Sequence, residues 1–273
     1  MTSLNFTVDP ALCTQCDACV QDCPAHIIAR SSSVPSVEAS SEEACIHCQH
    51  CLAVCPAGAI SIFGLTPENS LPLSNSVLPS HEQMQRFVRG RRSVRQFRPE
   101  NVPASLIDEL LADIAHAPTG CNIRDLTFSV VDNRKDIERL LEQVVAIIEN
   151  EKDPSVPDFV RGAAEVYRKE KVDAFFRGAP HLLVVSPGTQ AMCGQEDTIL
   201  ALAYFELLAQ SAGVGTTWCG MMKLTADTVP GIRPLLGIEP NTYFYAMMFG
   251  LPAVRYARTV QRDTTATIRR IKP

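Results

Sequence analysis

The chain has 273 residues, of which 46% are hydrophobic and 20% are charged, and its net charge at neutral pH is −5. These values describe a soluble globular protein with room for two domains. No apolar run approaches the roughly 20 residues that span a bilayer, and the N-terminus lacks the basic and apolar regions of a signal peptide. We therefore expect a cytoplasmic protein with no membrane partner.

The negative charge is concentrated near the N-terminus. Residues 1–66 contain six acidic residues and a single base, Arg30, whereas residues 67–273 contain equal numbers of acids and bases. An acidic first module would attract a basic patch on a partner or on the second domain.

Eight of the eleven cysteines stand in two runs of identical spacing, CTQCDACVQDCP at 13–24 and CIHCQHCLAVCP at 45–56. Thiols at such short gaps converge on one point, which favours metal or cluster ligation over a scattered disulfide framework. Zinc also takes four thiolates. However, zinc ribbons pair two CxxC units, and a third close cysteine followed by Cys-Pro fits zinc poorly.

The two runs resemble those of bacterial two-cluster ferredoxins, and the resemblance covers about residues 5–63. In that family three close cysteines bind one 4Fe-4S cluster and the fourth reaches the other cluster. His47 and His50 lie inside the second run, either as ligands or tuning donors or as side chains that fill space. The resemblance implies one-electron carriage, with one cluster on Cys13, Cys16, Cys19 and Cys55 and a second on Cys45, Cys48, Cys51 and Cys23.

The stretch GLTPENSLPLSNSVLPSH at 64–81 is rich in Pro, Ser and Asn and shows no helical or strand periodicity. Such a stretch is typical of a domain boundary. The predicted organisation is a cluster domain at 1–65, a linker at 66–81 and a second domain at 82–273.

Beyond the linker, hydrophobic periodicity alternates between helical and strand patterns. Helices outnumber strands, and several look apolar nearly all round, which predicts an α+β layer fold with helices buried inside a dimer. The expected helices are HEQMQRFVRGRR, 103–118, 133–150 and 197–213, the last ended by Gly213, and the expected strands are 126–131, 180–187 and 242–250.

Six arginines lie between residues 86 and 98, with Ser93 among them. Such a cluster can clasp a phosphate through charge-assisted, bidentate bonds. A solvated basic face or a nucleic-acid patch is the alternative. Because the basic character is confined to this segment and the domain is neutral, we expect no nucleic-acid partner.

Four motifs in this domain occur in an informative order: RRSVRQF followed by Val-Pro and a helix, APTGCN at 117–122, GVGTTWCG at 213–220, and FGLPAVRYARTVQR at 249–262. Together they resemble the FMN-dependent nitroreductase family over about residues 82–265. The resemblance implies a nitroreductase-type α+β sandwich that forms a homodimer and binds FMN across the interface.

The resemblance also implies a set of FMN-binding residues. Arg91, Arg92, Ser93 and Arg95 would bind the phosphate and ribityl chain, and Arg262, or else Arg258, would close on the phosphate. The loop residues Pro118, Thr119, Gly120 and Asn122 would lie against the flavin of the neighbouring subunit. Backbone N–H groups at Gly220 and Met221 would contact the flavin near N5, where glycines allow close backbone approach.

One departure from the family pattern follows the loop. The family commonly has Gln-Pro-Trp where this chain has Ile123, Arg124 and Asp125. Arg124 is a candidate for gripping an anionic substrate, or it forms a surface ion pair with Asp125 or another acid. The segment 156–178 corresponds to a variable helical insertion in the family, and its aromatic residues either line the substrate opening or pack it: Phe159, Tyr167, Phe175 and Phe176.

These expectations combine into an iron–sulfur flavoprotein oxidoreductase. A donor, either reduced ferredoxin or NAD(P)H, would supply electrons through two 4Fe-4S clusters to FMN and on to an organic acceptor such as a nitroaromatic, a quinone or an activated alkene. The reacting atom would be flavin N5, with no obligatory catalytic side chain. The alternatives are another flavin reaction on the same fold, such as dehalogenation or flavin breakdown, and a redox sensor or electron-transfer adaptor.

Overall fold

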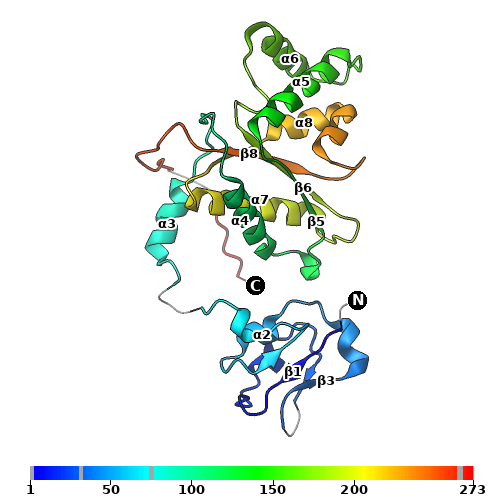
Figure 1. The fold of residues 1–273 in the computed structure, drawn as a ribbon, viewed down its shortest axis with the longest axis vertical. Helices are drawn as coiled ribbons and strands as arrows, with labels where there is room; N and C mark the ends of the chain where they lie inside the picture. Colours follow the sequence, from blue (N-terminus) through cyan, green and yellow to red (C-terminus); the bar gives the residue numbers. More distant parts are fainter. Residues whose placement is uncertain (1–2, 31–32, 74–76, 263–266, 273) are drawn as a thin grey trace. The chain divides into compact units, whose positions relative to one another are not determined.

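The computed structural model describes residues 3–30, 33–73, 77–262 and 267–272. The chain divides into two compact units, Met1–Pro79 and Ser80–Pro273 (Figure 1). Part of the expected linker, residues 74–76, lies outside the described residues. In the described part of the chain, no helix combines the length and apolar character needed to cross a membrane.

The first unit has little regular structure. Two short antiparallel pairs join β1 (Thr7–Val8) to β4 (Ile60–Ser61) and β2 (Ile28–Ala29) to β3 (Ser36–Val37). Two five-residue helices, α1 (Ala18–Asp22) and α2 (His50–Val54), pack against each other. The 3-10 turns η1 (Ala39–Ala44) and η2 (Pro67–Asn69) complete the unit.

The two cysteine runs have the same backbone conformation. Gln15 and His47, which occupy equivalent positions, both have φ of 56°. The residues before the two helices, Asp17 and Gln49, have φ of 59° and 60° and lie in the left-handed region. The repeat of 32 residues in the sequence is therefore also a repeat of local structure.

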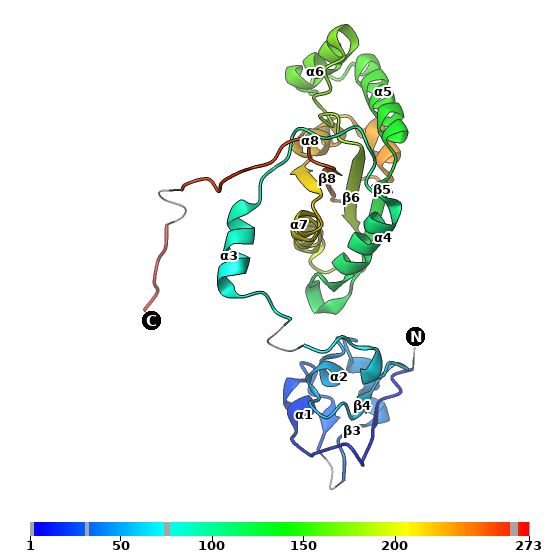
Figure 2. The same cartoon turned by 60° about the vertical axis from the view of Figure 1, so that its left-hand side comes forward.

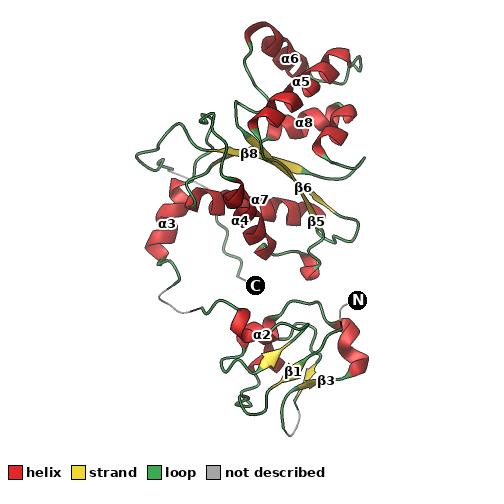
Figure 3. Cartoon of the chain, viewed as in Figure 1, coloured by secondary structure: helices red, strands yellow, loops and turns green. Residues whose placement is uncertain are grey.

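The second unit is built on a four-stranded antiparallel sheet with the order β5-β6-β8-β7 (Figure 3). The central strands β6 and β8 lie between the edge strands β5 and β7. The strand bounds are β5 (Leu126–Val131), β6 (His181–Pro187), β7 (Gly215–Trp218) and β8 (Tyr245–Gly250).

Helices cover both faces of this sheet (Figure 1). Leu182 and Val184 of β6 belong to the core shared with α5 and α6, whereas Leu183 and Val185 belong to the core shared with α4 and α7. This alternation follows from the two-residue period of a strand, and burial on both faces explains why β6 is a continuous apolar run. The helix bounds are α4 (Ala104–Asp113), α5 (Arg134–Asn150), α6 (Asp158–Glu170), α7 (Gly194–Ser211) and α8 (Gly220–Thr228), with 3-10 turns η3 (Ile114–His116), η4 (Gly120–Asn122) and η5 (Pro230–Leu236).

Helix α3 (His81–Gly90) opens the second unit and lies to one side of the sheet (Figure 2), where its Phe87 carbonyl accepts from the Gln210 side chain of α7 at 2.8 Å. It begins with a capping box, in which the Ser80 hydroxyl accepts from the Gln83 N–H and the Gln83 side chain accepts from the Ser80 N–H. None of its residues is buried, although Met84, Phe87 and Val88 give it an apolar face.

Most elements follow the sequence pattern, and the differences have local causes. Pro103 is the N-cap of α4 and not part of its first turn, and α7 begins three residues earlier than expected. Strand β7 and helix α8 were not expected as regular elements, because a four-residue strand and a short helix next to glycines are hard to recognise from periodicity.

Candidate functional site

The first unit contains two cavities, each lined by four cysteines. The structure groups the cysteines into the two sets that the sequence predicts: Cys13, Cys16, Cys19 and Cys55 around one cavity, and Cys23, Cys45, Cys48 and Cys51 around the other. The fourth cysteine of each run lies in the cavity of the other run. Cys23 and Cys55 are the C-caps of the five-residue helices α1 and α2, and both have extended backbone.

Within both sets the cysteine thiols differ in how deeply they are buried. Burial raises the pKa of Cys51 to about 11 and also raises the pKa of Cys19 and Cys45, whereas the Ala18 N–H lowers the pKa of Cys16. Buried thiols of this kind lose their protons when a metal binds them. In the described part of the chain no group of three or more Cys, His, Asp or Glu side chains is placed to hold a single metal ion. Each set of four cysteines lines a cavity.

The two histidines of the second run have different positions. His50 lines the second cavity, and its Nδ1 lies 3.2 Å from the Asp22 carboxylate. The ring of His47 packs against Phe63 with centroids 4.6 Å apart. His50 therefore has its side chain at the cavity, whereas His47 contributes a backbone hydrogen bond to the Cys45 thiol.

In the second unit, a cavity of about 390 Å³ collects arginines from distant parts of the chain. Arg86 and Arg92 come from the expected phosphate-binding segment, and Arg255 comes from the C-terminal segment. The Nε atom of Arg92 is buried and has no hydrogen-bond partner among the described residues. An unpaired buried cationic donor beside two further arginines suits a phosphate group.

The other arginines expected at this site lie elsewhere. Arg91 donates to the buried Glu206 of α7 at 2.9 Å, so its charge is neutralised within the unit. Arg95 is exposed, and Arg258 and Arg262 are exposed in the C-terminal segment. None of these four lines the cavity. Arg86 and Arg255 were not singled out from the sequence, although both belong to the two basic segments that were.

Ser93 joins its segment to two other parts of the chain through its backbone atoms. It forms a bridge with Thr216 of β7, and its carbonyl accepts from the Tyr256 hydroxyl at 3.4 Å. Tyr256 itself lines the arginine cavity. The segment is thereby joined to both β7 and the C-terminal segment.

Two glycines near this cavity have structural roles. A Cβ on Gly215 would lie 2.7 Å from a methyl group of Val94, so β7 and the arginine segment can approach only because residue 215 is glycine. Gly213 has φ of 75° directly after the α7 cap, a conformation that favours glycine.

The loop expected to lie against a flavin is held by α7. The Gly120 N–H donates to the buried Asp197 carboxylate at 3.0 Å, and the Arg124 N–H donates to the Thr119 hydroxyl at 3.0 Å. Asn122 completes η4 with φ of 56°, and Pro118 is exposed. Asp197 was not predicted, because nothing in the sequence near it indicates a partner 77 residues away.

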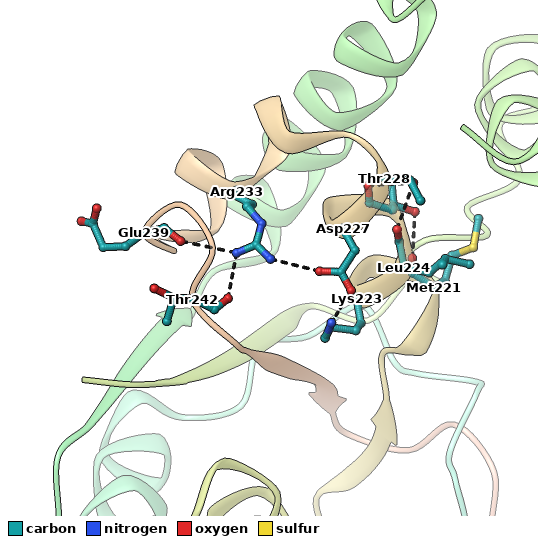
Figure 4. Close-up of polar contacts among 9 residues, drawn as sticks. Met221, Lys223, Leu224, Asp227, Thr228, Arg233, Glu239 and Thr242 are labelled. Atoms are coloured by element: carbon teal, nitrogen blue, oxygen red, sulfur yellow. Dashed lines mark hydrogen bonds and ion pairs between the residues drawn. The ribbon is translucent and has the colours of Figure 1, made fainter. Parts of the chain in front are cut away.

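Gly220 and Met221 begin helix α8, whose other end is fixed by a network of charges (Figure 4). Arg233 donates to the Thr242 carbonyl at 2.8 Å and to the Asp227 carboxylate at 3.0 Å, and Lys223 also pairs with Asp227. The network ties α8 to the segment that leads into β8. It keeps the first turn of α8 at a defined place beside the sheet.

The aromatic residues of the 156–178 segment divide between core and surface. Phe175 and Phe176 are fully buried, and the Tyr167 hydroxyl donates to Glu142 at 2.7 Å. Phe159 is exposed on α6. Cys219 is also buried, its thiol donates to the Phe175 carbonyl at 3.4 Å, and burial raises its pKa to about 12. These contacts make Phe175, Phe176 and Cys219 packing residues.

The sequence matches two known families. Residues 88–251 match the Nitroreductase family, and residues 12–60 match the 4Fe-4S dicluster domain. The chain is 29% identical over 169 residues to a candidate NADH dehydrogenase/NAD(P)H nitroreductase of Methanothermobacter thermautotrophicus, which covers 61% of this chain and 75% of the relative. It is 28% identical over 130 residues to the iodotyrosine deiodinase of Thermotoga neapolitana, covering 46% and 67% respectively.

Solved structures share the fold of the second unit. A nitroreductase with bound FMN from Bacteroides fragilis superposes with a TM-score of 0.54 at 22% identity, covering 68% of this chain and 99% of the other. An FMN-dependent nitroreductase from Clostridium difficile gives a TM-score of 0.50 at 18% identity, covering 70% and 100%. At these identities the likeness concerns the fold alone.

Proposed function

Because the chain belongs to the nitroreductase family, we propose that it is an iron–sulfur flavoprotein oxidoreductase that passes electrons from a donor through two 4Fe-4S clusters to FMN and on to an organic acceptor. The observation that carries this proposal is the presence, in one chain, of two four-cysteine cavities and an arginine-lined cavity.

The cysteine cavities fit 4Fe-4S clusters. A cubane needs four thiolates that surround a space, which is how each set of four cysteines is arranged. Backbone N–H groups near the sulfurs stabilise the negative charge of a cluster, and the Ala59 N–H already donates to the Cys55 sulfur at 3.3 Å. Each set would hold one cluster.

The arginine cavity fits the phosphate of FMN. Arg86, Arg92 and Arg255 would hold the phosphate, with the buried Arg92 Nε as a donor that needs an acceptor. The loop at 118–122 and the start of α8 would contact the ring, as the family resemblance implies. Bound FMN would supply the ability to take up single electrons and deliver two to an acceptor.

A homodimer is part of the proposal, and α7 and α3 support it. Leu200 and Tyr204 are 39% and 40% exposed and lie one helical turn apart on α7, whose opposite face is buried in the core. Helix α3 likewise has an apolar face, with Met84 and Val88, that nothing in its own unit buries. Apolar helix faces of this kind are covered by a second copy in symmetric dimers. Tyr204→Arg should lower the molar mass in light scattering from dimer to monomer.

The acceptor would be a nitroaromatic, a quinone or an activated alkene, and the donor reduced ferredoxin or NAD(P)H, in the cytoplasm. The chain itself would bind the cofactor and orient it. None of the residues that line the arginine cavity is acidic, but Arg86 pairs with Glu82 at 2.5 Å, so Arg92 and Arg255 are the lining arginines without an ion pair in the described part of the chain.

The proposal is tested by counting cofactors in protein purified without oxygen. Released flavin, identified by chromatography, should be FMN at about one per protomer, with about eight irons. The loaded enzyme should then reduce nitrobenzene or a quinone with NAD(P)H or reduced ferredoxin. Irons without flavin would reject the flavoprotein assignment, and flavin without turnover of any acceptor would favour a redox sensor or adaptor.

A second candidate activity is reductive dehalogenation, favoured by the 28% identity to a deiodinase. Iodide release from an iodinated phenol, measured beside nitrobenzene reduction under the same donor, separates the two. Iodide release at the faster rate would support the second candidate.

A further inference from the structure

A second cavity of the larger unit, of about 310 Å³, lies outside the arginine cavity. Its walls come from η3, the loop that follows it and the first residues of β5. Ligand pockets are commonly about 300 to 1,000 Å³, so this cavity has the size for a small organic molecule. The apolar part of its lining is Ile114, Ala115, Ala117, Ile123, Leu126 and Phe128.

Arg124 is the single charged residue that lines this cavity. The ion pairs and side-chain hydrogen bonds found in the described part of the chain do not involve its guanidinium. The alternative of an ion pair with Asp125 is not seen among the described residues, and the Asp125 carboxylate accepts from the Gln190 N–H at 2.7 Å. Arg124 therefore presents an uncompensated positive charge at the edge of an apolar space.

The backbone holds Arg124 in this position. Its φ of 54° lies in the left-handed region, and its N–H donates to Thr119, which also lines the cavity. Because the loop is further tied to the buried Asp197 through Gly120, the arginine is attached to a fixed support and not to a free loop. A pre-positioned guanidinium is suited to bidentate binding of a carboxylate.

We propose that this cavity binds an organic carboxylate, with Arg124 on the carboxylate and the apolar walls around the body of the molecule. Resting on the proposed function, we assign this ligand as the electron acceptor. The cavity shares Thr119 with the loop expected to lie against the flavin of the neighbouring subunit. The acceptor class is thereby narrowed from nitroaromatics, quinones and alkenes in general to those that carry a carboxylate.

The first test measures binding without turnover. Benzoate, which the enzyme does not reduce, is titrated into the cofactor-loaded protein in a calorimeter, with benzamide as the uncharged counterpart. Benzoate should bind the wild type and bind Arg124→Gln about 10- to 100-fold more weakly, the loss expected for a charged hydrogen-bonding group. Benzamide should bind both proteins weakly and equally. Arg139→Gln is the matched control, because Arg139 is an exposed arginine on α5 paired only with Asp136.

The second test compares 4-nitrobenzoate with nitrobenzene as acceptors. In Arg124→Gln the KM for 4-nitrobenzoate should rise about 10- to 100-fold relative to the KM for nitrobenzene, whereas in Arg139→Gln the kinetics with both acceptors should match the wild type. The KM of Arg124→Lys for 4-nitrobenzoate should lie between those of the wild type and Arg124→Gln, because lysine keeps the charge but loses the bidentate geometry.

The outcomes separate this inference from the proposed function. Loss of benzoate binding in Arg124→Gln without reduction of either nitro compound supports the carboxylate site and rejects the acceptor assignment. Reduction of both compounds with the same kinetics in wild type and Arg124→Gln, together with unchanged benzoate binding, overturns the site. Equal weakening in Arg139→Gln overturns it as well, because a general charge effect would then explain the result.

Discussion

The two units of this protein assemble their sites in opposite ways. In the cluster unit, each four-cysteine set is drawn from two segments of at most eleven residues, and the same backbone turn is used twice. In the larger unit, the arginine cavity unites residues as far apart as Arg86 and Arg255. The first site depends on local chain geometry, whereas the second depends on the whole sheet and its covering helices.

This difference predicts how each unit responds to amino-acid substitution. A local site tolerates differences elsewhere but loses its ligand when one cysteine is replaced. A site built from distant segments is sensitive to packing residues that never touch the ligand, such as Gly215. Four experiments test this difference between the two units.

The largest effect is expected from single cysteine replacements in the cluster unit. Cys23→Ser and Cys51→Ser should lose the same cluster, and Cys16→Ser and Cys55→Ser should lose the other, because the sets are crossed between the runs. Iron should fall from about eight to about four per protomer. The measurement is iron content together with the electron paramagnetic resonance spectrum of the reduced protein.

FMN content provides the control, since it should stay unchanged in all four variants if the units are independent. A Cys23→Ser spectrum that matches Cys16→Ser instead of Cys51→Ser would show that each run binds its own cluster.

In the larger unit, Arg92→Gln should weaken FMN binding about 10- to 100-fold, because a buried charged donor to phosphate is lost. Arg91→Gln should change FMN binding less and stability more, since Arg91 pairs with Glu206. Fluorescence titration of flavin-free protein measures both affinities. The reverse order would place the phosphate at Arg91, which is one of the residues that the family resemblance implies together with Arg92.

Gly215→Ala should lower the free energy of unfolding of the larger unit by about 1–3 kcal/mol, because the added methyl group collides with Val94. The double variant with Val94→Ala should recover part of that loss. Gly162→Ala on α6 is the control, where open space is available and alanine should be neutral or stabilising by up to about 1 kcal/mol. Denaturant unfolding followed by the fluorescence of Trp218, the single tryptophan, reports on this unit alone. Equal stability of Gly215→Ala and wild type would mean that the segment that contains Val94 can move away from β7.

The smallest effect concerns pH. Burial lowers the pKa of His181 below its ordinary 6.5, against the opposing charge of Asp132, and the His181 Nε2 accepts from the Val102 N–H at 2.8 Å. A lowered pKa means that the unfolded chain binds the proton more readily. Stability is therefore fully present above about pH 6.5 and declines as pH falls below it.

His181→Gln keeps an acceptor at this position without a titrating group. Its melting temperature should fall less than that of the wild type between pH 7 and pH 5.5, measured by the same fluorescence. Parallel declines of the two proteins would assign the acid sensitivity to other groups.

Much of the fold follows from local pattern. Strand β5 matches the expected residues 126–131, and α5 begins one residue after the expected Asn133, whose side chain caps it. Strand β7 was missed because its pairing with β8 depends on residues about thirty positions later. Helix α8 was missed because its short apolar face is completed only by packing against η5 and β8.

The residues of the candidate sites likewise include some that the sequence could predict and some that it could not. The eight cysteines stand out in the sequence by their spacing, and their crossed grouping is what the resemblance to two-cluster ferredoxins implies. Spacing could not decide which arginines share a cavity. Arg91 and Arg92 are neighbours in sequence, yet one pairs with Glu206 and the other lines the cavity.

The sequence by itself determined the composition of the two units, the two runs of cysteines and most of the helices and strands, since these depend on residue type and on interactions within a few residues. The tertiary structure decided which cations remain unpaired. Arg91 is neutralised by an acid on α7, whereas Asp125, the expected partner of Arg124, bonds to the backbone of another loop. Whether a charge is available to a ligand depends on contacts between segments about 65 to 115 residues apart, which no local pattern encodes.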